Sequence, residues 1–326
     1  MLLLFAPIRR KKQVTCKSPR AAICRYERRS DMKQVAPRHF APSSLIWEEL
    51  TRAELAVKRD RGALVIVPTG AIEQHGDFLP VETDTLLASA VAEMAASRIS
   101  DVEVVVAPAV AVGFSPHHLS LSGTISLRLE TYLSVLADTA RSILDSGFPR
   151  VIFVNGHGGN SAPLRSACAQ LLTDGYSAGM VDYFAPGEKE WLPLLKGGLS
   201  RTGHACEQET ALTMALMAPE ARARLERMVR DLPSRLIQPW IAPGHEDDPI
   251  TSYGGAWAPI FQADDCGYFG DPGKATAENG RLILELTVAG LANYLQAFAR
   301  TPLRLGLSRD PDRPRISPPL PLISKK

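Results

Sequence analysis

The chain has 326 residues, enough for one large α/β domain with additions or for about two domains. Apolar residues make up 45% and charged residues 22%, close to soluble globular averages, which excludes a disordered chain, a collagen-like fibre and a coiled coil. No run of ~18 apolar residues occurs, so we expect no membrane span and no membrane partner. The five cysteines are scattered without a Cys-x-x-Cys pair, which favours a reducing, cytoplasmic location.

The net charge of +2 conceals two regions of opposite sign. Residues 1–40 carry eleven Lys and Arg against two acidic residues, which leaves the rest of the chain near −7. An acidic body argues against a nucleic-acid partner, because such proteins carry a basic binding surface. We expect a basic leader at 1–43 that is disordered or not translated, a folded domain at 44–300, and a flexible Pro- and Arg-rich tail at 301–326. A chain of about 32–305 is expected to fold by itself.

Within the folded domain, apolar runs alternate with helical patterns. Four runs are typical of buried strands, the third of them ending in a glycine loop: 63–70, 102–113, 150–160 and 176–186. Helical spacing with good helix formers marks 84–98, 129–147, 161–173, 207–217 and 279–300. Continuous apolar strands separated by helices predict a mostly parallel sheet covered on both faces.

The first cluster of candidate ligands follows the first strand. Glu73 and His75 are two residues apart, and Asp84 begins the next helix. Ligands of open α/β sheets bind at the carboxyl ends of strands, and alternate residues of an extended chain point the same way. Carboxylates and imidazole suit Zn²⁺, Mn²⁺ or Fe²⁺. The alternative is a polar loop whose His and Asp only cap a helix.

A glycine-rich loop, FVNGHGGN at 153–160, follows the third strand. The glycines beside His157 permit close backbone approach and leave its ring unobstructed. A phosphate cradle is not favoured, because the Lys of a P-loop is absent. We expect Asn155 and Asn160 to fasten this loop. The alternative is a structural turn that carries a surface His.

A third cluster lies at 202–216, where His204 precedes Glu207 and Glu209 at a helix start. Two side chains at i and i+2 diverge by about 200° on a helix, so only one of the two glutamates can comfortably face a metal. The helical wheel favours Glu209, because it lies three residues before the inward Leu212. The alternative is that both carboxylates only interact with the helix dipole.

A fourth cluster, at 112–127, contains Ser115, His117 and His118. A hydroxyl and two imidazoles at a strand end can line a substrate pocket. Ser115 does not lie in a Gly-x-Ser-x-Gly pattern, so a hydrolase nucleophile is not favoured. The alternative is a buried His that is hydrogen-bonded in the core. Four successive loops with His, Glu and Asp nevertheless predict one common site.

Five motifs, in the same order, resemble those of the creatininase (creatinine amidohydrolase) family: TGAIEQHGDFLPVETDT, SPHHLSLSGTISL, NGHGGN, GHACEQET and GYFGDP. The resemblance spans about 45–300. It implies a three-layer α/β/α sandwich with a mostly parallel central sheet, and two divalent metal ions per subunit. It also implies hydrolysis of an amide C–N bond in a small-molecule substrate, and a homohexamer.

The resemblance further implies a set of metal ligands, namely Glu73, His75, Asp84 and His157. Asp84 matches a bridging carboxylate. Creatininase itself has a ligating Glu where this chain has Gly159, so the chain resembles the GHGGN branch of the family, whose members cleave formamides and a precursor peptide. There a Glu of the later motif completes the site, and we predict Glu209, with Glu207 as the rival. The same departure argues against creatinine as the substrate.

We therefore predict an amidohydrolase in which a metal-bound hydroxide attacks the carbonyl of a cyclic amide, a formamide or a short peptide. His204 is predicted to carry a proton to the leaving nitrogen, and Glu209 to serve as ligand and catalytic residue. Ser115 and His118 are predicted to orient the substrate. Two alternatives stay open at this point. One is an enzyme of the same fold with a non-amide substrate, such as a sugar or inosose-type hydrolase or isomerase. The other is a metal-binding protein without catalysis.

Overall fold

The computed structural model describes residues 45–199, 202–236, 266–306 and 315–323, all within the unit Phe40–Lys326. The expected basic leader at 1–43 lies outside the described residues. Four parallel strands form the central sheet, in the order β2-β1-β3-β4. Their bounds are β1 Leu64–Thr69, β2 Val104–Val106, β3 Arg150–Asn155 and β4 Ala178–Asp182.

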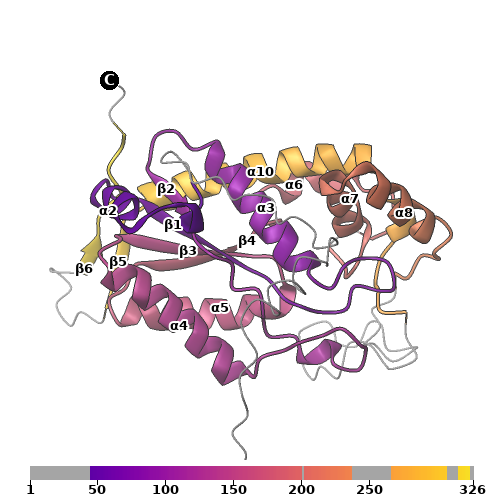
Figure 1. Ribbon diagram of the computed structural model, residues 1–326, viewed down its shortest axis with the longest axis horizontal. Coiled ribbons are helices and arrows are strands. Elements are labelled where there is room, and N and C mark those ends of the chain that lie inside the picture. The colour runs from indigo at the N-terminus through magenta and orange to yellow at the C-terminus, as the bar shows by residue number, and fades with distance from the viewer. Residues whose placement is uncertain (1–44, 200–201, 237–265, 307–314, 324–326) are drawn as a thin grey trace, which may run out of the picture. The chain divides into compact units, whose positions relative to one another are not determined.

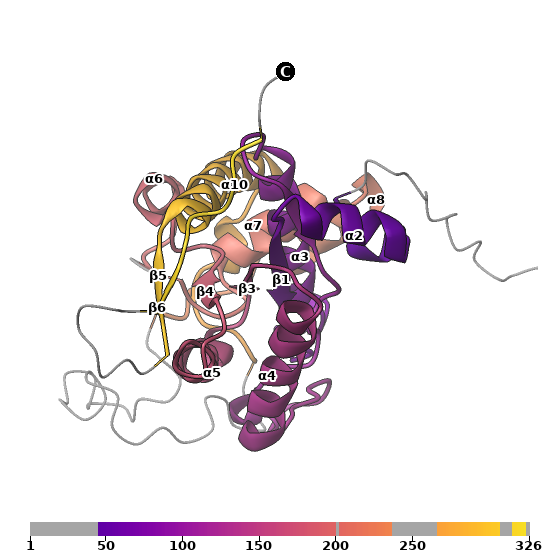
Figure 2. The same cartoon turned by 90° about the vertical axis from the view of Figure 1, so that its left-hand side faces the viewer.

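Helices cover both faces of this sheet, as Figures 1 and 2 show. The first face is covered by α3 Thr83–Ser97 and α10 Ala277–Arg300, and α6 Glu188–Trp191, α7 Glu207–Leu216 and α8 Pro219–Val229 pack into the same apolar core. The second face is covered by α4 Leu129–Asp145 and α5 Ser161–Thr173, and α2 Arg52–Asp60 packs against that second core. The predicted α/β/α sandwich with a parallel sheet is thus confirmed. The second strand is shorter than expected, because Pro108 has no N–H to continue the ladder.

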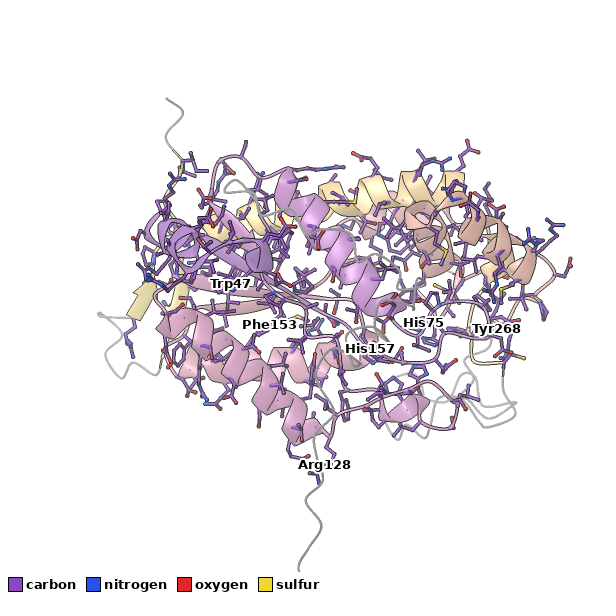
Figure 3. All side chains as sticks on the ribbon, in the orientation of Figure 1. Trp47, His75, Arg128, Phe153, His157 and Tyr268 are labelled. Atoms are coloured by element: carbon purple, nitrogen blue, oxygen red, sulfur yellow. The ribbon has the colours of Figure 1, made fainter. Side chains whose placement is uncertain are left out.

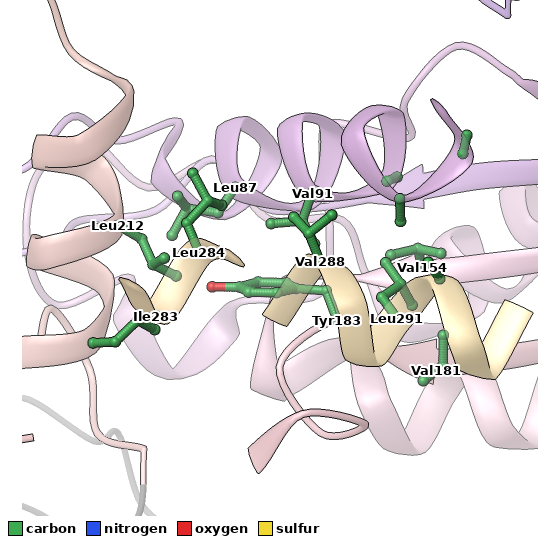
Figure 4. Packing of buried hydrophobic residues seen from close by; sticks show 14 of the residues in the cluster. Leu87, Val91, Val154, Val181, Tyr183, Leu212, Ile283, Leu284, Val288 and Leu291 are labelled. Carbon is green, nitrogen blue, oxygen red and sulfur yellow. The ribbon is translucent and has the colours of Figure 1, made fainter. Parts of the chain in front are cut away.

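The side chains of alternate residues of each strand pack into two separate apolar cores, one on each face of the sheet. In β3, Ile152 and Val154 pack into the first core, whereas Val151 and Phe153 pack into the second. All four are fully buried. Strands covered on both faces lack a polar side, which is why the sequence shows continuous apolar runs. Figure 4 shows Val154 in the first core with residues of α3 and α10.

Among the described residues, one helix, α10, is long and apolar enough to cross a membrane by length and composition. It packs against α7 and α3 and buries side chains such as Val288 and Leu291 in the first core. A helix packed inside a protein core meets the same two criteria, and α10 packs in this way.

The C-terminal tail at 301–326 differs from the prediction that it is flexible. β5, Leu303–Leu305, pairs antiparallel with β6, Arg315–Ser317. Further along, Leu320 is 5% exposed, and its N–H donates to Ala299 O over 2.9 Å. The described part of the tail is therefore packed on the end of α10.

A buried arginine explains this docking. Arg150, fully buried at the start of β3, donates to Thr301 O at 2.8 Å and to Pro318 O at 2.9 Å. It also donates to Phe298 O in the last turn of α10, where a cation interacts favourably with the helix dipole. The composition of the tail does not predict this docking, because the donor, Arg150, belongs to β3 and not to the tail.

Candidate metal centre

The ends of β1 and β3 bring four predicted ligands together. Glu73 and His75 lie in the loop after β1, Asp84 lies in the first turn of α3, and His157 follows β3. All four side chains belong to residues that are at most 4% exposed. Figure 3 shows His75 and His157 at the same end of the sheet.

Imidazole nitrogens surround the two carboxylates at short range. His157 Nδ1 lies 3.2 Å from Glu73 Oε2 and 3.1 Å from Asp84 Oδ2. His75 Nε2 lies 3.1 Å from Asp84 Oδ1, and His204 Nδ1 lies 3.6 Å from Glu73 Oε1. Asp84 thus presents one oxygen to each of two rings, which is the disposition that a carboxylate shared by two cations requires.

Three of these rings are anchored through the nitrogen that faces away from the carboxylates. The contacts are His75 Nδ1 to Glu73 O at 3.1 Å, His157 Nε2 to Phe114 O at 3.2 Å and His204 Nε2 to Gln74 O at 2.8 Å. A carbonyl oxygen only accepts, so in a neutral ring the outer nitrogen carries the hydrogen and the inner nitrogen keeps its lone pair. Such outer anchors are typical of metal-ligating histidines.

Burial and charge together shift the pKa values of these groups. Burial raises the pKa of Glu73 above its ordinary value, and His157 offsets this only in part. Burial opposes the ionisation of Asp84 too, but His75 and His157 hold its pKa below the ordinary value. Burial would lower the pKa of His75, but Asp84 and the other carboxylates raise it to about 10. In the metal-free protein, protons therefore supply positive charge where a divalent cation would otherwise do so.

The donor set fits a divalent cation. Both oxygens of Glu73 and Oδ2 of Asp84 are buried and accept no hydrogen bond within the described part of the chain. The described residues form three groups of candidate ligands, and within each group the ligand atoms lie within 4.8 Å of one another. The groups are Glu73 with His117 and His157, Glu73 with His75 and His204, and His75 with Asp84 and Glu209. Carboxylate and imidazole are ligands of Zn²⁺, Mn²⁺ and Fe²⁺, so these residues suit the metals that the sequence predicts.

Two asparagines hold the loop that carries His157, as expected. Asn155 Nδ2 donates to His157 O over 2.6 Å, and its Oδ1 accepts the His157 N–H at 3.2 Å. Asn160 donates to Gly70 O and accepts the Phe114 N–H, each at 2.9 Å. Asn160 therefore ties together the loops that follow the first three strands.

Gly159 leaves no room for a side chain. A Cβ atom there would lie 2.4 Å from His157 Nε2 and 2.7 Å from Phe114 O. These two atoms form the contact that orients the His157 ring. Any side chain at this position, a Glu included, would displace that ring.

Glu207 and Glu209 of α7 have different partners. Glu209 is the third member of the group that it forms with His75 and Asp84, and burial raises its pKa to about 7. Glu207 accepts the Lys196 N–H at 2.9 Å and the N–H of the next residue at 2.8 Å. Glu209 therefore lies with the candidate ligands, whereas Glu207 holds the loop that precedes the third cluster.

A strained turn places His204. Ala205, which follows it, has φ 47° and is the only non-glycine residue with positive φ in the described ranges. His204 pairs with Phe269, donating to its O over 3.0 Å and accepting its N–H at 2.7 Å. Strain of this kind costs about 1–3 kcal/mol and is concentrated at functional sites. Burial, and then His75, hold the pKa of His204 well below its ordinary value, so the ring is neutral.

Ser115 and His118 occupy different positions around the centre. Ser115 is fully buried behind a ligand, with Oγ 3.1 Å from His157 Nε2. His118 Nε2 lies 3.4 Å from Glu73 Oε1, and its Nδ1 lies 2.9 Å from Gln74 Nε2. Ser115 is thus placed to support a ligand ring, and His118 is placed beside a candidate ligand carboxylate.

Two residues of the site were not singled out from the sequence. Gln74 contacts two imidazoles, but a Gln between two ligands carries no chemical signal of its own. Asp271 accepts the Gly198 N–H at 2.9 Å and the Ser234 hydroxyl, and so helps Glu207 to hold the same loop. It belongs to the motif GYFGDP, which carries no ligand or catalytic pattern of its own.

The fold and this centre define a class: a three-layer α/β protein with buried carboxylates and imidazoles, suited to divalent metal, at the strand ends. The sequence pattern of the creatininase family, described as creatinine amidohydrolase, matches residues 48–295. The chain belongs to the creatininase family.

Named relatives differ in what they act on. The mycofactocin precursor peptide peptidase of Mycobacterium tuberculosis (strain H37Rv) is 32% identical over 232 residues, which are 69% of this chain and 81% of that protein. The creatinine amidohydrolase of Pseudomonas putida is 27% identical over 274 residues, which are 78% of this chain and 96% of that protein.

Solved structures of creatininase share the fold. A creatinine amidohydrolase (creatininase) structure superposes with a TM-score of 0.63 at 25% identity, covering 79% of this chain and all of the other. Other creatininase structures are described as the Mn form and, for a Glu-to-Gln variant, the Zn-Zn type.

Proposed function

We propose that this protein is a divalent-metal-dependent hydrolase that cleaves an amide C–N bond. One observation carries the proposal: three imidazoles surround the buried carboxylates of Glu73 and Asp84, and both Glu73 oxygens and Asp84 Oδ2 have no hydrogen-bond partner in the described residues. The family supports the reaction class, because its model is described as creatinine amidohydrolase and the relatives reported above are named a peptidase and an amidohydrolase.

The proposed ligands of two divalent ions are Glu73, His75, Asp84, His157 and Glu209. Asp84 faces two of the rings and is the proposed bridge between the ions. When bound, such ions polarise a carbonyl oxygen and lower the pKa of water to about 7, so that a nucleophile is available at neutral pH. The metals proposed are Zn²⁺, Mn²⁺ or Fe²⁺.

The remaining roles fall to residues at the edge of the centre. His204 is partly exposed and has its lone pair on Nδ1, so it can take a proton from the attacking water and return it to the leaving nitrogen. His118 is proposed to orient the substrate. Ser115 is proposed to help orient the substrate indirectly, through its contact with His157 Nε2.

The substrate is proposed to be an amide other than creatinine. Relatives that share 32% identity are named mycofactocin precursor peptide peptidase, which supports a short peptide as a candidate beside formamides and cyclic amides. Gly159 supports the exclusion of creatinine, because it leaves no space for the carboxylate that creatininase is expected to use there.

The test is hydrolysis by protein of known metal content. Chelated protein reloaded with Zn²⁺, Mn²⁺ or Fe²⁺ is incubated with peptides, formamides and cyclic amides, and products are identified by mass spectrometry. We expect the metal-loaded protein to cleave one of these classes and the metal-free protein to cleave none. The Asp84→Asn variant should cleave none of them. Metal-loaded protein that leaves every amide intact would favour a metal-binding protein without catalysis.

We also propose that the chain forms a homohexamer and acts in the cytoplasm. The homohexamer is implied by the family resemblance, and the cytoplasmic location is supported by the scattered cysteines. Light scattering of the purified protein measures the mass of the assembly, and fractionation of the source cells locates it.

A further inference from the structure

The side chain of Gln74 has a fixed orientation among the imidazoles. It is buried, at 4% exposure, and its Oε1 accepts the Gly76 N–H over 2.9 Å. The opposite orientation would place the amide NH₂ against another donor. Its Nε2 therefore faces two rings, at 2.9 Å from His118 Nδ1 and 3.1 Å from His204 Nε2.

Only one of these two rings can accept from the amide. His204 Nε2 lies 2.8 Å from the main-chain oxygen of Gln74, and a carbonyl oxygen only accepts. His204 Nε2 therefore carries a hydrogen and cannot also accept one. The amide of Gln74 donates to His118 Nδ1 instead.

A threonine holds the two partners in this register. The main-chain N–H of Gln74 donates to Thr124 Oγ1 over 3.1 Å, and the same hydroxyl donates to His118 O over 3.3 Å. The contact between the Gln74 amide and the His118 ring is thus supported by the backbone on both sides.

We propose that Gln74 is a positioning residue that places the ring hydrogen of His118 on the nitrogen that faces the centre, whereas His75, His157 and His204 carry theirs on the outer nitrogen. Because His118 Nδ1 accepts, its hydrogen lies on Nε2, the atom that is 3.4 Å from Glu73 Oε1. His118 therefore presents an N–H donor to the centre, whereas the other three rings present lone pairs.

This difference separates a donor from the candidate ligands. An imidazole whose inner nitrogen carries a hydrogen cannot coordinate a metal through it. It can donate to a carboxylate or to the carbonyl oxygen of a bound amide, where negative charge develops during attack. The role toward substrate rests on the proposed function; the tautomer does not.

The tautomer is measured directly on protein labelled with ¹⁵N-histidine. Solid-state NMR distinguishes protonated from unprotonated ring nitrogens, and His118→Leu assigns the His118 signals. We expect a protonated Nε2 and an unprotonated Nδ1 in the wild type. In Gln74→Glu, a carboxylate faces Nδ1, so the hydrogen should move to Nδ1. A protonated Nδ1 in the wild type, or His118 signals unchanged in Gln74→Glu, overturns the proposal.

Metal content and kinetics test whether Gln74 acts through His118. Gln74→Met should keep the metal content, because the three candidate ligand rings retain their main-chain anchors, while kcat/KM falls by ~10-fold or more. In the His118→Leu background, Gln74→Met should cause no further loss. Loss of metal from Gln74→Met, or full additivity of the two losses, overturns the proposal.

A matched control is Gln208→Met, the same substitution at a buried glutamine whose amide lies 3.4 Å from Tyr183 Oη. It should leave the His118 signals unchanged. If the metal-loaded wild type hydrolyses no amide, the proposed function fails, yet the NMR measurement still decides the tautomer.

Discussion

Glu207 and Glu209 leave the same turn of α7 toward different parts of the molecule. The Glu207 carboxylate binds main-chain N–H groups of the loop that begins at Lys196, whereas that of Glu209 lies within 4.8 Å of candidate ligand atoms of His75 and Asp84. Residues at i and i+2 of a helix point apart, so a single turn can serve a loop and a metal centre at once.

We therefore expect the two Glu→Gln variants to behave differently. Glu209→Gln keeps the shape but removes one ligand charge, and should lower metal occupancy and turnover by ~10-fold or more. Glu207→Gln should keep the metal but lower the free energy of unfolding by about 1–3 kcal/mol, because an amide donor then faces main-chain N–H groups. Elemental analysis and denaturant titration of both variants check this. Loss of metal from Glu207→Gln alone would exchange the two assignments.

Chelation should abolish activity and leave the fold largely intact. The candidate ligands lie at the strand ends, outside the two apolar cores, and protons on His75 and His157 can replace the charge of the cations. The melting temperature should fall by the linkage to metal binding alone. Circular dichroism and activity are measured before and after chelation. Full turnover by protein verified as metal-free would contradict the mechanism.

The chelated protein should lose stability as the pH rises above ~7. His75 has a pKa of about 10 and Glu209 of about 7, above their ordinary values of 6.5 and 4.5. Between pH ~7 and ~10 the folded state therefore binds more protons than the unfolded state, so the free energy of unfolding falls with increasing pH. Below this range His117, His118 and His204 act in the opposite sense, because burial lowers their pKa values and keeps their rings neutral in the folded state. Urea titrations at pH ~7, ~8 and ~9 check the slope, and a rise in stability over this range would contradict it.

The sheet and its helices follow from local patterns and could be predicted. Buried parallel strands contain continuous apolar runs, as at 64–68 in β1 and 151–154 in β3, and α5 lies at 161–173, as its helical spacing predicts. The docking of the tail could not be predicted, because it depends on Arg150 of β3 meeting Pro318 across a large separation in the sequence. A single long-range contact of that kind leaves no periodic signal.

The grouping of the candidate ligands at one end of the sheet was predictable from the sequence. Glu73, His75, Asp84 and His157 each follow a predicted strand or begin a helix, so topology alone brings them together. The partners around them were not predictable, because Gln74 acts through the direction of its amide. That direction is set by the Gly76 N–H, which only the folded turn supplies.

A chain that ends at residue 305 should be less stable than the sequence implies. It would lose β6, the burial of Leu320 and the hydrogen bonds that Arg150 donates to the tail. Burial of one leucine and a few hydrogen bonds together contribute about 3 kcal/mol or more. The free energies of unfolding of chains ending at 305 and at 323 are compared with that of the full chain. Equal stability of the chain ending at 305 would mean that this docking contributes nothing.

Adjacent glycines of the His157 loop should respond differently to the same substitution. In Gly159→Ala, the new Cβ atom would lie 2.4 Å from His157 Nε2, so the ring must move out of line with Glu73 and Asp84. We expect metal affinity to fall by ~10- to 100-fold, as it does when a supporting contact of a ligand is lost.

Gly158→Ala is the matched control, because no atom outside its immediate neighbours lies within 4 Å of the new Cβ. Metal affinity should be unchanged, and the free energy of unfolding should change by no more than about 0.5 kcal/mol. Calorimetric titration of the chelated variants with Zn²⁺ measures both affinities. If Gly159→Ala bound Zn²⁺ as tightly as Gly158→Ala, the orientation of His157 would not depend on its contact with Phe114, and another residue would have to hold that ring.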